Sequence, residues 1–264
     1  MSLEKGLSRT QAWNINFKRH WPLLVLLSCT LIYVFIFCYI PMYGILIAFQ
    51  DGYMPGDPIV GDITVWNGLD NFKEFFSNDQ FTTIFLNTFL LCLYGFLVGF
   101  PLPIIVALLL NALRGKRTKK VLQTIFYAPH FISLVVLVGM LYIFFGSGGL
   151  FPNISKDLGG SGSSAFLSAA AFRPLFIFSG NWQDFGWSAI IYLAALAGVD
   201  PALHEAAVID GASRWQRILH IDLPTIMPTV ATLLILSIGN LMGVGYEKVL
   251  LMQTDGNIAT SEII

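Results

Sequence analysis

Long apolar stretches without any Asp, Glu, Lys or Arg alternate along this chain with shorter polar segments. Four of them cover residues 21–50, 81–113, 121–155 and 223–246. Each is longer than the roughly 20 residues that an α-helix needs to cross about 30 Å of hydrocarbon. A fifth stretch, 185–199, is shorter. The pattern predicts an all-α integral membrane protein with five spans.

The short stretch 185–199 cannot cross a bilayer by itself, because a helix of that length rises only about 22 Å. Its end is set by Asp200 and Pro201, which suit the N-cap and the first position of a following helix. We therefore expect this span to start about 20 residues before residue 199. Three polar residues then lie in or near the outer leaflet: Asn181, Gln183 and Asp184. The Asp184 carboxylate either faces a water-filled cavity or a partner, or lies at the headgroup level below neighbouring tryptophans.

Composition agrees with a membrane protein. The chain is 55% hydrophobic and 12% charged, with a mean hydropathy of +0.69, which excludes a soluble domain of average composition. The first apolar stretch is too long to be the core of a cleaved signal peptide, so we expect it to remain as a span. All three cysteines lie inside apolar stretches, where they act as small hydrophobic residues, so neither a disulfide framework nor a metal cluster is predicted.

The distribution of basic residues predicts the orientation. If the N-terminus is cytoplasmic, the segments left inside are 1–20, 114–120 and 199–222. They carry Lys5, Arg9, Lys18, Arg19, Arg114, Lys116, Arg117, Lys119, Lys120, Arg214 and Arg217. These are 11 of the 15 Lys and Arg residues, and an excess of Lys and Arg marks the cytoplasmic side.

Two segments are then expected outside, 50–80 and 146–180. The first is rich in Gly, Pro and Asp, and its residues 67–79 have phenylalanines at helical spacing, which predicts a short amphipathic helix on the membrane surface. In the second span, Pro101 and Pro103 remove backbone donors, so we expect a bend there.

The polar segment between the last two spans predicts a helix, a turn and a second helix. Asp200 caps the first helix, and Gly211 is the residue that can adopt a left-handed conformation at its end. Ser213 and Gln216 have the spacing of a capping box, which starts the second helix. We expect the fifth span to begin near Pro224 and to end within 243–253.

This segment resembles the EAA loop of permease subunits of bacterial ATP-binding cassette (ABC) importers. The matching positions are Glu205, Ala206, Ala207, Asp210, Gly211, Ala212, Ile221, Leu223 and Pro224. YAPHFIS at 127–133 and GNLMGVGYEKVLLMQ at 239–253 are similar to permeases that import oligosaccharides and acidic polysaccharides, an alginate importer among them. The resemblance covers most of the chain. Such subunits usually carry a sixth, C-terminal span, so either the sequence stops short of it or that helix is absent.

The resemblance implies a type I importer permease in a bacterial inner membrane, with a cytoplasmic leader at 1–20, a permease domain at 21–264 and the EAA loop at 200–224. Its partners would be a second permease, two ABC ATPase subunits, an extracytoplasmic saccharide-binding protein and membrane lipid, and no nucleic acid. The chain has no phosphate-binding G-x-x-x-x-G-K-[ST] sequence. ATP and Mg²⁺ would therefore be bound by the ATPases, and this chain would hold no cofactor or metal and would not be an enzyme.

In the family, the loop inserts into a groove of the ATPase as a short coupling helix. The residues expected to couple are Glu205, Ala206, Ala207, Asp210, Gly211, Ala212 and Arg214. A saccharide is bound by aromatic faces and hydrogen-bonding groups, and the candidates by depth are His130, Asn181, Gln183, Asp184, Asn240, Tyr246, Glu247 and Lys248. For His130, a hydrogen bond between helices is an equally good explanation.

Two other functions agree less well with the sequence. A secondary transporter or channel working alone would need ion-coupling acids in mid-span, and the predicted spans contain no acid apart from Asp184 and Glu247 near their outer edges. A membrane enzyme would need a catalytic cluster near one interface. His204, Glu205, Asp210, His220 and Asp222 form such a group in sequence, but their spacing matches no metal motif.

Overall fold

The computed structural model describes residues 9–61, 65–113, 115–243 and 245–263, with side chains from residue 20 onward. The chain divides into two compact units, residues 1–78 and 79–264. Helix α1 (Arg9–Val34) runs across residue 20, so the division between a leader and a permease domain stays a prediction.

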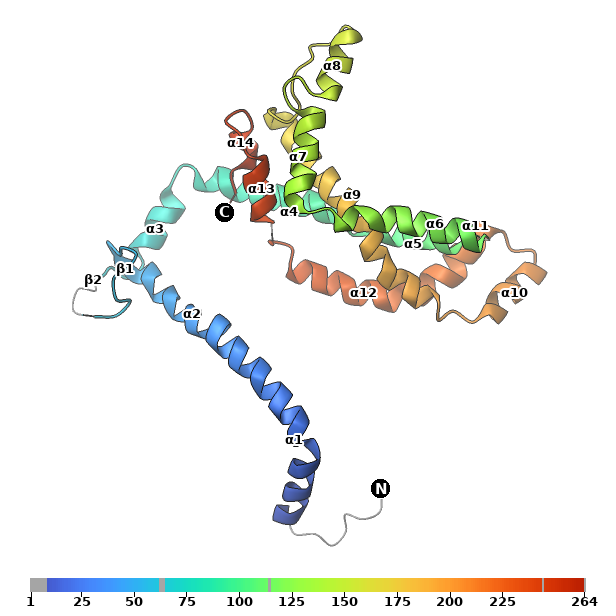
Figure 1. Cartoon of the computed structure of the whole chain (residues 1–264), viewed down its shortest axis with the longest axis horizontal. Helices are drawn as coiled ribbons and strands as arrows, with labels where there is room; N and C mark the ends of the chain where they lie inside the picture. Colours follow the sequence, from blue (N-terminus) through green and yellow to red (C-terminus); the bar gives the residue numbers. More distant parts are fainter. Residues whose placement is uncertain (1–8, 62–64, 114, 244, 264) are drawn as a thin grey trace. The chain divides into compact units, whose positions relative to one another are not determined.

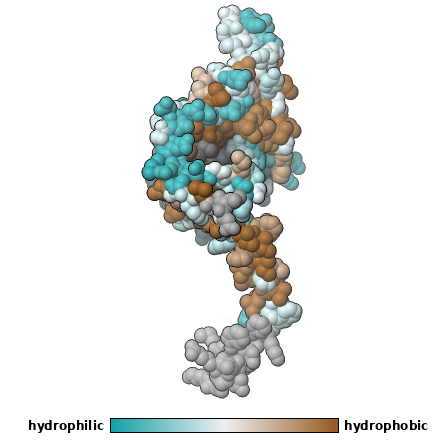
Figure 2. All heavy atoms as spheres, turned by 90° about the vertical axis from the view of Figure 1, so that its left-hand side faces the viewer, coloured by the Kyte–Doolittle hydropathy of each residue, from teal (hydrophilic) through white to brown (hydrophobic). Residues whose placement is uncertain are grey.

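The first unit is built around one long helical segment (Figure 1). Helix α1 continues through the π-helical turn η1 (Phe35–Tyr39), the short α2 (Ile40–Met42) and the 3₁₀ helix η2 (Tyr43–Phe49). The part from His20 to Phe49 is long and apolar enough to span a membrane, and none of its most apolar window is buried. Its apolar side chains cover the arm seen in Figure 2. An exposed apolar surface of this length suits a membrane-spanning helix, as predicted for the first span.

The segment at 50–80, predicted to be external, contains more structure than the sequence predicted. Strands β1 (Gln50–Asp51) and β2 (Val65–Trp66) pair antiparallel, a small addition to an otherwise helical protein. The predicted amphipathic helix is confirmed as α3 (Asp70–Ser77). It is held in place by Asn71, whose side-chain nitrogen donates to the carbonyls of Ala48 and Gln50 at 3.1 and 2.8 Å.

The second unit begins with the second span, which the prolines divide into α4 (Phe81–Gly99) and α5 (Pro101–Asn111). The amide of Phe100 still donates to the carbonyl of Phe96 at 2.9 Å, so the helical path continues over the whole of Phe81–Asn111. Pro101 has no amide hydrogen, so the hydrogen-bond ladder of this continuous path lacks one bond there.

The third predicted span is not one helix. Helix α6 (Lys116–Tyr127) leads into the 3₁₀ turn η3 (Ala128–Phe131), and α7 (Leu134–Phe145) begins after it, followed by α8 (Leu150–Asp157). The break follows from two residues. Pro129 has no amide to continue the helix, and Ser133 caps α7 by accepting from the amide of Val136.

The helix of the fourth span begins earlier than predicted, inside the segment 146–180 that is expected outside. Helix α9 (Ala169–Leu196) is 28 residues long and includes Arg173 and Asp184. In the sequence, Asp184 ends the apolar stretch 185–199, and Arg173 lies further upstream. In the structure, the guanidinium of Arg173 donates to the side-chain oxygen of Asn87 in α4 at 2.7 Å. A charge with a partner in the neighbouring helix does not prevent the helix from extending.

The start and end of the fifth span are also corrected. Helix α11 (Arg214–Arg217) runs through the π-helical turn η4 (Ile218–Asp222) directly into α12 (Leu223–Gly239). Pro224 therefore lies inside a continuous helix, and the wider π turn before it is a local adjustment of the hydrogen-bond ladder. The helix ends at Gly239, and α13 (Tyr246–Met252) and α14 (Ile258–Ser261) are separate.

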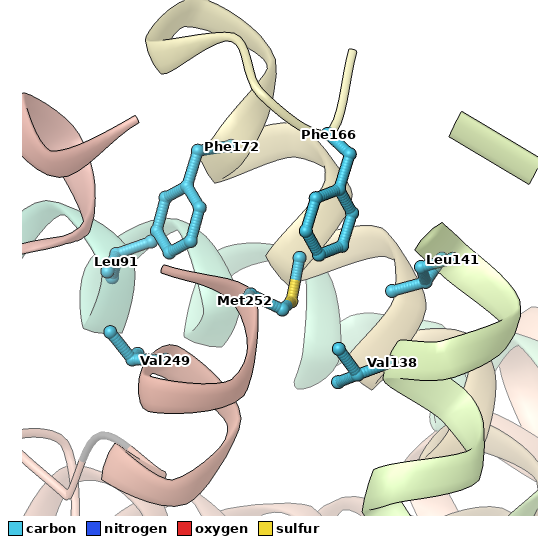
Figure 3. Packing of buried hydrophobic residues seen from close by; sticks show 7 residues of the cluster. All are labelled: Leu91, Val138, Leu141, Phe166, Phe172, Val249 and Met252. Atoms are coloured by element: carbon cyan, nitrogen blue, oxygen red, sulfur yellow. The ribbon is translucent and has the colours of Figure 1, made fainter. Parts of the chain in front are cut away.

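Helix α9 is the central element of the second unit, and it lies against α4, α5, α6, α12, α13 and α14. Figure 3 shows one apolar cluster, in which Leu91, Val138, Leu141, Phe166, Phe172, Val249 and Met252 converge from α4, α7, the turn before α9, α9 itself and α13. A second cluster joins α5, α9, η4 and α12. Among the described residues, four helical segments are suited to cross a membrane, and five when α9 is counted with the next helix, α10 (Pro201–Ile209), which it meets at 78°.

A buried asparagine ties the C-terminal helices to this unit. Asn257 is 0% exposed, and its amide nitrogen donates to the carbonyls of Phe166 and Met252 at 3.0 and 2.9 Å. Its oxygen accepts from the amide of Thr254 and from the hydroxyl of Ser261. Every hydrogen-bonding site of this side chain is therefore used.

Replacing Asn257 by alanine is expected to lower the free energy of unfolding by about 2–3 kcal/mol, because two carbonyls, an amide and a hydroxyl lose their partner in a buried place. Thermal unfolding of the purified protein in detergent measures this. Asn240→Ala is the matched control, since Asn240 is exposed and bonds only to Leu236 in its own helix. Equal midpoints for the two variants would contradict the structural role of Asn257.

Candidate functional site

The polar segment at 200–224 folds as the predicted helix, turn and helix. A side-chain oxygen of Asp200 accepts a hydrogen bond from the amide of Ala202 at 2.9 Å, and Pro201 occupies the first position of α10. The two residues predicted to start this helix are therefore confirmed as its N-cap and its first position.

The end of α10 is a Schellman motif built on Gly211, which has a φ of +77°. The amide of Ala212 donates to the carbonyl of Ala207 at 2.8 Å, and the amide of Gly211 donates to that of Val208 at 3.1 Å. These are the two bonds that define the motif. The left-handed conformation explains the glycine, because an L side chain there is strained.

The capping box at the start of α11 is confirmed as well. The hydroxyl of Ser213 accepts from the amide of Gln216 at 3.3 Å, and the side-chain oxygen of Gln216 accepts from the amide of Ser213 at 2.7 Å. The turn between α10 and α11 is thus fixed on both sides by hydrogen bonds within the loop itself.

Most of the residues expected to couple are accessible to solvent. Glu205, Ala206, Asp210, Gly211 and Arg214 are exposed, and Ala207 and Ala212 are half-buried. Sequence reasoning missed the apolar side chains that share this surface. They are Leu203, Val208, Ile209 and Trp215, with Ile209 86% exposed. A rigid loop that presents carboxylates beside apolar side chains has the chemistry of a protein docking surface.

The five residues that a membrane enzyme would need as a catalytic cluster do not all come together. His204 and Asp222 contact each other at 3.2 Å, whereas Glu205, Asp210 and His220 are exposed. Within the described part of the chain, no group of three or more His, Cys, Asp and Glu residues is arranged to hold a metal ion.

The outer polar candidates form contacts between helices. The Nδ1 atom of His130 in η3 lies 2.9 Å from a carboxylate oxygen of Asp184 in α9. The imidazole also stacks on the indole of Trp187, with ring centres 4.5 Å apart and planes 6° from parallel. Asp184 therefore has a partner in the protein, and its depth in the bilayer stays a prediction.

Neighbouring candidates on α9 are used in the same way. The side-chain nitrogen of Gln183 donates to the carbonyl of Ile132 at 2.7 Å. A Cβ atom at Gly99 would collide with the side-chain oxygen of Asn181, so the glycine permits close packing of α4 on α9.

Lys248 is buried, whereas the adjacent Glu247 and Tyr246 are exposed. The Lys248 ammonium donates to the carbonyl of Phe176 at 2.8 Å and lies 4.7 Å from the centre of that phenylalanine ring. It joins α13 to α9 and does not line an open surface. The adjacent residues 247 and 248 thus face different sides of α13.

A cavity of about 670 Å³ lies between α4, α5, α9 and α12. Of the eight pathway candidates, only Asn240 lines it, together with residues that sequence reasoning did not select. These include Trp187, Ser188, Ser237, Gly95 and Gly99. An aromatic face beside hydroxyl and amide groups is typical of a saccharide-binding surface. The signal in the sequence was weak, because one tryptophan among six does not stand out.

The chain is similar to known transport proteins. A model of the family described as "Binding-protein-dependent transport system inner membrane component" matches residues 99–245. The chain is 40% identical to protein LplB of Bacillus subtilis (strain 168). The alignment extends over 261 residues and covers 98% of this chain and 80% of LplB. The chain is 41% identical to the polygalacturonan/rhamnogalacturonan transport system permease protein YteP of the same organism, over 93% of this chain and 75% of YteP.

Two solved structures contain a similar chain. One is a bacterial ABC transporter involved in the import of the acidic polysaccharide alginate, with a TM-score of 0.84, 36% identity, and coverage of 96% of this chain and 84% of that chain. The other is a bacterial alginate ABC transporter in complex with an alginate pentasaccharide-bound periplasmic protein, with a TM-score of 0.83, 36% identity, and coverage of 94% and 82%.

Replacing Gly211 by alanine is expected to cost about 1–2 kcal/mol of local stability, because the Schellman turn requires the left-handed conformation. Backbone amides of residues 207–216 should then exchange with deuterium about tenfold faster. Gly198→Ala is the control, because Gly198 has no positive φ and a Cβ there makes only ordinary contact. If both variants exchange like the unmodified protein, the turn is not held by Gly211.

Proposed function

Because this chain belongs to the family of binding-protein-dependent transport system inner membrane components, we propose that it is a permease subunit of an ATP-driven importer of oligosaccharides or polysaccharides. The predicted helical-bundle fold of an importer permease is confirmed by the likeness to the two alginate transporter structures. Its family identifies the chain as an inner membrane component and as a transport subunit.

The observation that carries the proposal is the geometry of the loop at 200–224. Helix α10 is capped at both ends and followed by a capping box, so the loop is stiff, and it presents Glu205, Asp210 and Ile209 outward. A stiff element transmits a displacement, whereas a flexible loop would absorb it. We infer that α10 docks on an ATPase subunit, which binds ATP and Mg²⁺, and that a second permease completes the pathway.

The proposed cargo follows from the relatives and from the cavity. YteP is a permease for polygalacturonan and rhamnogalacturonan by name, and the structural neighbours import alginate. A binding protein loaded with such a saccharide would deliver it from outside, with the N-terminus of this chain in the cytoplasm. Trp187 at the cavity offers the aromatic face that a sugar ring stacks on.

Loss of the Glu205 carboxylate tests the docking surface. In an importer purified with its ATPase subunits, Glu205→Ala is expected to lower hydrolysis stimulated by saccharide-loaded binding protein by about tenfold, the size of a lost hydrogen bond to a charged group. Glu74→Ala, which removes an equally exposed glutamate from α3, should leave stimulation intact. Stimulation that survives in Glu205→Ala and in Gly211→Ala would contradict the proposal.

The cavity is tested by Trp187→Ala. Uptake of labelled alginate or galacturonan oligosaccharides into proteoliposomes is expected to fall by about three- to tenfold, because an aromatic contact of about 0.5–1.5 kcal/mol is lost. Trp182→Ala is a matched control, because Trp182 is similarly exposed and does not line this cavity. Equal uptake by both variants would remove Trp187 from the pathway.

A further inference from the structure

Helix α10 is attached to the rest of the protein by little packing. Seven of its nine residues are exposed, and the other two, His204 and Ala207, are only half-buried. Apolar burial therefore does not fix the angle of this helix, and its apolar side chains point outward. The hydrogen-bonded turn at Gly211 and Ser213 holds the C-terminal end of α10, and the rest of the helix needs another interaction to hold it.

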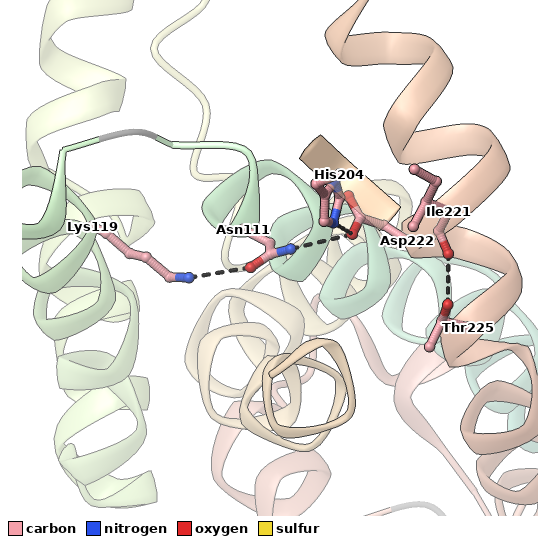
Figure 4. Close-up of polar contacts among 6 residues, drawn as sticks. All are labelled: Asn111, Lys119, His204, Ile221, Asp222 and Thr225. Atoms are coloured by element: carbon pink, nitrogen blue, oxygen red, sulfur yellow. Dashed lines mark hydrogen bonds and ion pairs between the residues drawn. The ribbon is translucent and has the colours of Figure 1, made fainter. Parts of the chain in front are cut away.

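A chain of polar contacts reaches α10 from three other helical elements, as Figure 4 shows. The ammonium of Lys119 in α6 donates to the side-chain oxygen of Asn111 in α5 at 3.3 Å. The amide nitrogen of Asn111 donates to Oδ1 of Asp222 in η4 at 3.4 Å. The Nε2 atom of His204 in α10 lies 3.2 Å from the same oxygen of Asp222.

Asp222 is the centre of this chain, and it is 3% exposed. A buried carboxylate is stable only with hydrogen bonds or an opposite charge. The cavity beside it, of about 450 Å³, is also lined by Glu205, Arg214 and Arg217. Loss of either contact would leave the buried carboxylate of Asp222 short of a hydrogen-bond partner, which is costly. Each of the two contacts also has a defined direction, unlike apolar packing.

The place of Asp222 gives the contact a mechanical role. Asp222 ends the π-helical turn that leads directly into α12. His204 and Asp222 therefore connect α10 to the fifth span, and Asn111 connects the same carboxylate to the end of the second span.

We propose that Asp222 is a positioning residue that sets the angle of the coupling helix through His204 and passes the movement of that helix to the fifth span. The positioning of α10 stands by itself, and the transmission of movement rests on the proposed function.

The positioning is tested on the full chain in nanodiscs, without any partner. Spin labels are attached to cysteines at Val208 and Leu219, both 53% exposed, after the three native cysteines are replaced by alanine. The unmodified pair should give one narrow distance distribution. Asp222→Asn and His204→Ala should each broaden or shift it, and His204→Gln, which keeps a side-chain nitrogen of similar reach, should restore it.

His220→Ala is the control, because His220 bonds only to the carbonyl of Gln216 in its own helical segment. It removes an imidazole near the loop and should leave the distribution narrow. His204→Ala also guards against misfolding, since it leaves the bond between Asn111 and Asp222 in place. A distribution in His204→Ala and Asp222→Asn that equals the unmodified one overturns the proposal.

Transmission is tested in the reconstituted importer as saccharide transported per ATP hydrolysed. His204→Ala should lower this ratio about tenfold, as expected for a lost hydrogen bond to a charged group, and His204→Gln should recover it, whereas a purely structural role would lower only the yield of assembled importer. If the unmodified importer shows no stimulated hydrolysis, the proposed function fails while the distance result stands. If it does, and His204→Ala couples equally well, the inference fails by itself.

Discussion

A polar group that lies in a membrane protein away from water has to find its partner inside the protein. This constraint decides which helices of the second unit are neighbours. The guanidinium of Arg173 meets Asn87 between α9 and α4, the ammonium of Lys248 meets a carbonyl between α13 and α9, and the imidazole of His130 meets Asp184 between η3 and α9. Each contact joins segments far apart in sequence, and α9 is a member of all three. The apolar clusters give the burial, while the polar contacts give the register, because apolar surfaces can slide and a hydrogen bond cannot.

The same constraint explains where sequence patterns were informative. Features that depend on a few adjacent residues were predicted correctly: the cap at Asp200, the turn at Gly211 and the capping box of Ser213 and Gln216. The amphipathic helix α3 belongs to this group as well. Each signal is complete within about five residues, so no tertiary information is needed to interpret it.

Features that depend on distant partners were not predictable. Counting about 20 residues back from residue 199 places the start of the fourth span near residue 180, whereas α9 begins at Ala169. The extra helix includes Arg173, whose partner Asn87 lies 86 positions away in the sequence. Most pathway candidates were chosen for polarity, yet Gln183 and Lys248 use that polarity to join helices. The cavity is instead lined by Trp187 and Ser188, whose chemistry is common in any membrane helix. Polarity inside a bundle thus identifies contacts between helices at least as often as it identifies a ligand site.

The proposed function places two demands on the short helix α10 in the loop at 200–224. To dock on a partner, α10 has to leave its apolar side chains, such as Val208 and Ile209, uncovered. To move the permease, it also has to be held firmly to the bundle, and the apolar residues cannot serve both surfaces. A single polar contact from His204 to the buried Asp222 meets the second demand at the cost of one half-buried side chain. Because the contact is directional, it constrains the angle of the helix as well as its distance from η4. Seven of the nine residues of α10 then remain exposed and free to contact a partner.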